Sequence, residues 1–161
     1  AELIMIVDLL RNDLGRVCRY GSVKVKALRT IETYRTVFQA TAEVTGEMAE
    51  DKDGFDLLHH CLPGGSVTGC PKIRAMQIID ELEPEPRFIY TGVLGYVNFN
   101  GEMDFNILIR TLLTENNKAA FYAGSAIVAD SDPHQEYEEI LVKARALKNS
   151  LGKLSLLSAR I

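Results

Sequence analysis

The sequence lacks several features that would point to a membrane, a secretory route or a nucleic acid. No apolar run reaches the length of a membrane span, and no signal peptide is visible. The formal net charge is −4 and no basic cluster occurs, so electrostatics give no reason to expect nucleic acid. The 3 cysteines, Cys18, Cys61 and Cys70, have no metal-ligand spacing and suit a reducing compartment. We therefore expect a soluble cytoplasmic protein without a membrane or nucleic-acid partner.

The composition is that of an ordinary globular domain, with 47% apolar and 25% charged residues among 161. That length suffices for one domain with a sizeable core. The chain opens inside an apolar helical pattern, without an initiator Met or an N-cap residue. We expect residues 1–161 to form a single domain, a C-terminal fragment of a longer protein, with a tail at 152–161.

The pattern of apolar and turn residues predicts an α+β fold with a largely antiparallel sheet. Helical spacing favours helices over 2–14, 53–61, 72–82 and 133–150. Alternating or β-rich segments predict strands over 21–29, 32–47, 92–99, 103–114 and 118–129. The last three strands are expected to form a meander, with Asn100-Gly101 as a strong hairpin signal.

A glycine-rich loop, Pro63–Arg74, leads into the third helix. Pro71 is expected at the first helical position, where its fixed φ fits and no N–H is needed. Free N–H groups there, with Ser66, Thr68 and Lys72 nearby, favour an anion site. The loop has no Gly-Lys-Ser/Thr sequence, so a carboxylate is a better candidate than a nucleotide. The alternative is a glycine turn that only enters a helix.

The last helix carries Glu136, Glu139 and Lys143 on one face, at i, i+3 and i+7. One interpretation is a solvated face with an ion pair between Glu139 and Lys143. The other is a site for a hard cation such as Mg²⁺, which takes one or two protein carboxylates and keeps several waters. A site of the second kind would need a partner carboxylate from elsewhere in the chain.

Three further segments carry polar groups in apolar surroundings. Arg110 ends an apolar strand, so it should either meet a carboxylate or lie at the sheet edge. Tyr90 either donates a hydrogen bond into a pocket or packs as an ordinary aromatic. Gly124-Ser125-Ala126 interrupts a strand, which indicates a bulge or a close backbone approach.

These motifs occur together, in order, in one known family. The segments Glu2–Asp13, Gly64–Lys72, Tyr90 with Gly95-Tyr96, Ile109–Thr111, and Ala129–Ser131 with Glu136–Glu139 resemble the chorismate-utilising enzymes. That family includes anthranilate synthase component I, aminodeoxychorismate synthase component I, and the isochorismate and salicylate synthases. The match spans residues 2–150 and corresponds to about the last third of such an enzyme, whose fold has two facing antiparallel sheets with helices outside.

The resemblance implies a role for each matched residue. Glu2 and Glu139 would bind Mg²⁺ directly, and Glu136 would reach it through water. The ion would hold the ring carboxylate of chorismate, with help from Lys143 and Ser66. The backbone N–H groups of Gly65, Gly124 and Ser125 would contact the same carboxylate. Arg110 and Tyr90 would clamp the enolpyruvyl carboxylate.

Within the family, phrases such as Leu-Pro-Gly-Gly-Ser-Val-Thr-Gly and Tyr-Thr-Gly-Val-Leu-Gly-Tyr most resemble aminodeoxychorismate synthase. That resemblance implies replacement of the 4-hydroxyl of chorismate by ammonia from a glutamine amidotransferase partner. Gln39 stands where many members have a His that assists the leaving group. Ala126 replaces a Gly beside the substrate carboxylate, and Cys70 replaces an Ala. The alternatives are anthranilate formation and a non-catalytic chorismate-binding fragment.

Overall fold

The computed structural model describes residues 2–34, 38–116 and 118–151. The Cα positions form two compact units. The first contains the chain up to Pro84 together with Val97–Met103, and the second contains Glu85–Tyr96 together with the residues from Asp104 onward. The α+β class is confirmed, because four α-helices accompany three two-stranded sheets in the described residues. The single-domain expectation stays a prediction, and its tail at 152–161 lies outside the described residues.

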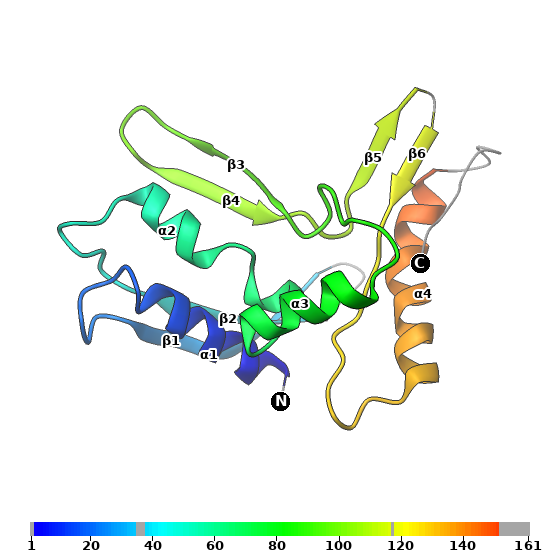
Figure 1. The fold of residues 1–161 in the computed structure, drawn as a ribbon, viewed down its shortest axis with the longest axis horizontal. Coiled ribbons are helices and arrows are strands. Elements are labelled where there is room, and N and C mark those ends of the chain that lie inside the picture. Colours follow the sequence, from blue (N-terminus) through cyan, green and yellow to red (C-terminus); the bar gives the residue numbers. More distant parts are fainter. Residues whose placement is uncertain (1, 35–37, 117, 152–161) are drawn as a thin grey trace. The chain divides into compact units, whose positions relative to one another are not determined.

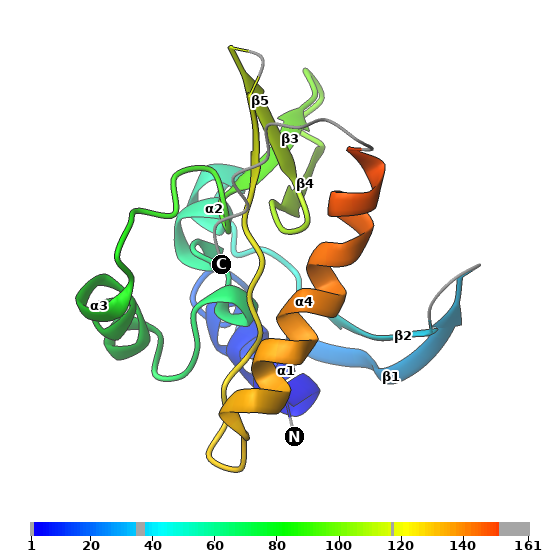
Figure 2. The ribbon, with the colours of Figure 1, turned by 90° about the vertical axis from the view of Figure 1, so that its right-hand side faces the viewer.

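The first unit is built around α1. Its elements are α1 (Glu2–Leu14), β1 (Lys24–Thr33), β2 (Phe38–Thr45), α2 (Gly54–Cys61), the short 3₁₀ helix η1 (Gly65–Val67) and α3 (Lys72–Leu82). Helix α1 packs against β1, β2, α2 and η1, and Figures 1 and 2 both show β1 and β2 as one antiparallel hairpin. The buried apolar side chains of this unit are Val7, Leu9 and Val17.

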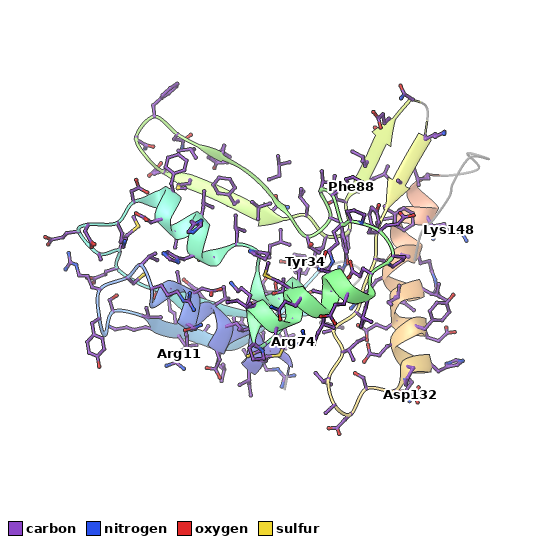
Figure 3. All side chains as sticks on the ribbon, viewed as in Figure 1. Arg11, Tyr34, Arg74, Phe88, Asp132 and Lys148 are labelled. Atoms are coloured by element: carbon purple, nitrogen blue, oxygen red, sulfur yellow. The ribbon has the colours of Figure 1, made fainter. Side chains whose placement is uncertain are left out.

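The second unit holds most of the β3–β4 hairpin, a second hairpin and the last helix. Strand β3 (Val93–Val97) pairs with β4 (Met103–Ile107), and β5 (Leu112–Glu115) pairs antiparallel with β6 (Lys118–Phe121). Helix α4 (Pro133–Ser150) begins after Asp132, whose carboxylate accepts the N–H of Gln135. Figure 3 labels Asp132 and Lys148 toward the two ends of this helix. No helix in the described ranges combines the length and apolarity needed to cross a membrane.

The helix predictions hold closely, because caps mark the helix ends. Asp53 accepts the N–H groups of Phe55 and Asp56, while Asp56 accepts the N–H of Asp53, which completes a capping box before α2. The placement of Pro71 is wrong by one residue. Pro71 has an extended ψ of 135° and is the N-cap of α3, so its carbonyl already accepts the N–H of Ala75.

The strand predictions are less accurate. Strand β1 continues to Thr33, so residues 32 and 33, which the sequence pattern places in the second strand, belong to the first. The predicted strand 103–114 is two strands, because Arg110 has a left-handed φ of 49° and interrupts the extended backbone between Ile107 and Leu112. The predicted strand 118–129 ends at Phe121. The three-stranded meander is therefore wrong, and two separate hairpins replace it.

A buried ion pair joins the end of α1 to the start of α3. The Nζ of Lys72 lies 2.6 Å from Oδ2 of Asp13, whose side chain is 4% exposed, while that of Lys72 is 18% exposed. Along the chain, the glycine-rich loop connects α2 to the part of α3 that carries Lys72. Burial raises the pKa of the nearby Cys61 thiol, and the Asp13 carboxylate raises it further. The pair thus holds a charged group inside the first unit at the point where the loop enters α3.

We expect Lys72→Met to lower the free energy of unfolding by about 3 kcal/mol, because it leaves the Asp13 carboxylate buried without its partner. Urea denaturation measures this change. The matched control is Lys26→Met, which breaks the exposed Lys26–Glu43 pair and should cost under about 1 kcal/mol. Equal effects of the two substitutions would show that the buried pair contributes no more than a surface pair.

Candidate functional site

The glycine-rich loop of the first unit leaves two backbone donors unused. Gly65 is buried against α1, and a Cβ built on it would lie 2.8 Å from Cδ1 of Leu9, so this position admits only glycine without a shift. The N–H groups of Val67, Thr68 and Gly69 donate to the carbonyls of Gly64 and Gly65. Within the described part of the chain, the N–H groups of Gly65 and Ser66 donate to no backbone carbonyl. These two donors remain for an anion.

Two side chains expected at this anion site are engaged elsewhere. Thr68 donates its hydroxyl to the carbonyl of Gly64 at 3.0 Å, which closes the loop on itself. Lys72 is held by Asp13. Both side chains thus lie beside the loop, each with an acceptor inside the first unit, and a role toward an anion stays a prediction. Ser66, in contrast, is exposed.

In the second unit, α4 presents the predicted acidic face. Lys143 and Glu139 form an ion pair of 2.5 Å, and the Glu139 side chain is 53% exposed. Glu136, one turn earlier, accepts two hydroxyl hydrogen bonds of 2.6 Å, from Ser125 on Oε2 and from Ser131 on Oε1. These two bonds, first Ser125 and then Ser131, hold the pKa of the Glu136 carboxyl below its ordinary value, and the positive charge of Lys143 acts in the same direction.

The donor set of this face fits a hard divalent cation. Glu136 and Glu139 offer carboxylate oxygens, which Mg²⁺ prefers, and each carboxylate keeps lone pairs beyond those used by Ser125, Ser131 and Lys143. Glu2 is the first residue of α1, and its side chain lies outside the described residues. Across the side chains that the structure describes, no group of three or more His, Cys, Asp or Glu is positioned to hold a metal. The metal-ligand roles therefore stay predictions.

Tyr90 and the segment around Gly124 lie close together in the second unit. The Tyr90 ring stacks on Tyr122 with centroids 5.4 Å apart and an interplanar angle of 18°, and the Arg87 guanidinium lies 5.8 Å from the Tyr90 ring centroid. A Cβ built on Gly124 would lie 2.8 Å from the Tyr90 hydroxyl. The interruption at Gly124 is thus a close approach, since the backbone makes room for the tyrosine hydroxyl.

The backbone around Gly124 also offers hydrogen-bond donors. Among the described residues, the N–H groups of Gly124 and Ser125 donate to no backbone carbonyl, because strand β6 has already ended at Phe121. Ser125 is half-buried. These are the two N–H groups that the resemblance assigns to a carboxylate.

Arg110 lies in the loop between β4 and β5 rather than inside a strand. It is exposed, and no ion pair to it occurs among the described residues. The first alternative left by the sequence, an ion pair with a carboxylate, is thus not observed in the described residues, and Arg110 lies past the end of β4 instead of in a strand at the sheet edge. Gln39 is an exposed residue of β2, opposite Glu32 of β1. Thus Glu2, Gln39, Gly65 and Ser66 belong to the first unit, and the other candidate residues belong to the second.

Sequence reasoning missed two residues that make clear contacts. Ser131 has the residue type of an N-cap, yet Asp132 caps α4 and Ser131 binds Glu136. Asp13 reads as a polar residue at the end of the first helix, yet it is buried. The position of Ser131, five residues before Glu136 and just outside the helix, could have indicated that it contacts Glu136.

We expect Gly124→Ala to lower the free energy of unfolding by about 1–2 kcal/mol, because the added methyl meets the Tyr90 hydroxyl while Tyr122 restrains the ring. Thermal or urea unfolding measures this change. In a Tyr90→Phe background the clashing oxygen is absent, so the same glycine substitution should cost clearly less. An unchanged cost in that background would contradict the close approach.

Comparison with known proteins agrees with these motifs. The profile of the chorismate binding enzyme family matches residues 1–149. Anthranilate synthase component 1 of Synechocystis sp. is 51% identical over 160 residues, 96% of this chain and 32% of the relative. Aminodeoxychorismate synthase component 1 of Bacillus subtilis is 46% identical over 151 residues, 94% of this chain and 32% of the relative. The chain thus spans about a third of the length of these curated relatives.

Solved structures give the same fold. Anthranilate synthase component I from Streptococcus pneumoniae has a TM-score of 0.80 and 41% identity, covering 89% of this chain and 33% of that one. A putative 2,3-dihydroxybenzoate-specific isochorismate synthase from Bacillus anthracis has a TM-score of 0.81 and 26% identity, covering 92% and 40%. Because the family profile covers nearly the whole sequence, the chain belongs to the chorismate binding enzyme family.

Proposed function

We propose that this chain carries the metal-binding and carboxylate-binding part of an enzyme that aminates chorismate to 4-amino-4-deoxychorismate. In that reaction ammonia adds and the 4-hydroxyl leaves as water. The supporting observation is the α4 face, where Glu136, Glu139 and Lys143 follow one another at intervals of about one helical turn. Such a set suits an anionic substrate held together with a hard cation. Mg²⁺, when bound, would neutralise the ring carboxylate and withdraw charge from the ring.

The chain's own residues would bind the two carboxylates of the substrate. Lys143 and the N–H groups of Gly124 and Ser125 are the proposed donors for the ring carboxylate. These N–H groups are fixed in the backbone, so they require little reorganisation when charge develops.

The clamp on the enolpyruvyl carboxylate consists of Arg110 and Tyr90. Arg110 can accept a carboxylate without giving up an ion pair seen in the described residues. The Tyr90 ring is held by its stacking on Tyr122, which orients the hydroxyl toward Gly124. Gln39, in place of a histidine, would donate a hydrogen bond from its amide to the departing 4-hydroxyl oxygen.

The proposed ammonia source is a separate glutamine amidotransferase subunit. The relatives named above are called component 1 of their synthases. Such a name implies that those synthases have a second component, which supports a partner subunit. We propose the cytoplasm as the compartment, since the 3 cysteines are free and burial raises the pKa of the Cys18 and Cys61 thiols.

Two other functions have support. Anthranilate formation is the second candidate, because the Synechocystis relative of that name is 51% identical to this chain. A non-catalytic chorismate-binding role is the third. It is supported by strand residues with large exposed apolar side chains, among them Ile31 and Phe38, since such surfaces normally require cover.

The test is turnover of chorismate with ammonium, with and without Mg²⁺, by the whole enzyme of which this chain is proposed to be part, followed by chromatographic separation of 4-amino-4-deoxychorismate from anthranilate. We expect the first product, only with Mg²⁺, and a loss of at least about 100-fold in Glu139→Ala, a substitution of a proposed metal ligand. Glu138→Ala is the matched control, because Glu138 is an exposed neighbour on the same helix. It should retain activity.

Each outcome selects one candidate. Anthranilate as the product would replace the proposed reaction by the second one. Binding of chorismate without turnover would support the third. Full activity in Glu139→Ala would remove the metal role from α4.

A further inference from the structure

Ser131 lies outside the residues to which the resemblance assigns a role. It precedes α4 and is half-buried. Its hydroxyl donates to Oε1 of Glu136 at 2.6 Å and accepts the N–H of Val128 at 3.0 Å. Its own N–H donates to the carbonyl of Val128 at 3.0 Å. The serine is therefore fixed at three points, one of which is a proposed member of the metal site.

The direction of the serine proton follows from this geometry. A hydroxyl has one proton to donate and two lone pairs to accept with. Because the Val128 N–H occupies a lone pair, the proton is free to point at the Glu136 carboxylate. A hydroxyl-to-carboxylate bond of 2.6 Å is within the range of charge-assisted hydrogen bonds.

The two serines together fix the plane of the Glu136 carboxylate. Ser125 holds Oε2 and Ser131 holds Oε1, so rotation about the last side-chain bond would break both bonds. Each oxygen retains a lone pair for a water molecule. A carboxylate held in this way has a fixed plane, so the directions of its remaining lone pairs are fixed as well, which suits an outer ligand to a hydrated Mg²⁺.

We propose that Ser131 is a positioning residue for Glu136 and tunes the affinity of the α4 face for Mg²⁺. The inference rests on the proposed function, because it takes Glu136 as a water-mediated ligand. The competing explanation is that Ser131 only closes the turn between Val128 and α4, as serines commonly do.

The experiment is titration of Mg²⁺ alone into the protein by isothermal calorimetry. We expect Ser131→Ala to weaken Mg²⁺ binding about 10-fold, the lower end of the range for residues that orient metal ligands. Ser131→Thr keeps the hydroxyl and should restore most of the affinity. The matched control is Ser22→Ala, since the Ser22 hydroxyl also accepts a backbone N–H, that of Glu47, but donates to the carbonyl of Arg19 in a turn of the first unit without candidate residues. It should leave Mg²⁺ binding unchanged.

A double variant separates positioning from a turn role. If Ser131 acts through Glu136, then adding Ser131→Ala to Glu136→Ala should weaken Mg²⁺ binding no further. If Ser131→Ala lowers the unfolding temperature but leaves the Mg²⁺ affinity at the wild-type value, the positioning role is overturned. Should Ser131→Ala fail to fold, Ser131→Cys preserves the size of the side chain with a much weaker donor. Wild-type affinity in that variant would also overturn the proposal.

The same titration distinguishes the metal site from the role of the serine. Wild-type protein that binds no Mg²⁺ would refute the metal role in the proposed function, and the role of Ser131 with it. Wild-type protein that binds Mg²⁺ equally well with and without Ser131 would refute only the role of this serine.

Discussion

The buried contact between Lys72 and Asp13 is the constraint on which the first unit depends. It joins the carboxyl end of α1 to the amino end of α3, and the glycine-rich loop runs into that junction. Because Lys72 is paired with Asp13, the proposed anion site on this loop relies on backbone donors. Within the described residues, the N–H groups of Gly65 and Ser66 donate to no backbone carbonyl.

In the second unit, candidate residues lie beside strained backbone. Thr91, which follows Tyr90, has a φ of 65°, and Arg110 itself has a φ of 49°. Left-handed backbone is unfavourable for a β-branched residue, so the surrounding contacts must hold it. Thr91 is buried, and its N–H donates to the carbonyl of Leu108. Left-handed backbone thus occurs at Arg110 and directly after Tyr90, the two residues proposed to clamp a carboxylate.

Sequence identity does not separate the products of this family. The chain is 51% identical to a protein named anthranilate synthase component 1 and 46% identical to one named aminodeoxychorismate synthase component 1. The proposed site residues would bind carboxylates and a cation, and both reactions begin from the same dianionic substrate. The features proposed to bind chorismate therefore do not distinguish the two reactions.

The sequence by itself determined the helices, the cap of α2 and the family. Asp53, the Asn100-Gly101 turn and the start of α4 at Pro133 are local signals, since each depends on hydrogen bonds or backbone angles within a few residues. The motifs that indicated the family are likewise short and ordered along the chain. The acidic face of α4 followed from helical spacing alone.

Only the tertiary structure decided which polar side chains are already engaged. Lys72 is bound by a carboxylate 59 residues away in sequence, and Glu136 is held by hydroxyls on the preceding loop. The division of the segment 103–114 into two strands likewise depends on the left-handed backbone at Arg110, which apolar periodicity does not reveal. Periodicity reports which face of an element is apolar. Hydrogen bonds between distant residues depend on distances in space, and those exist only once the chain has folded.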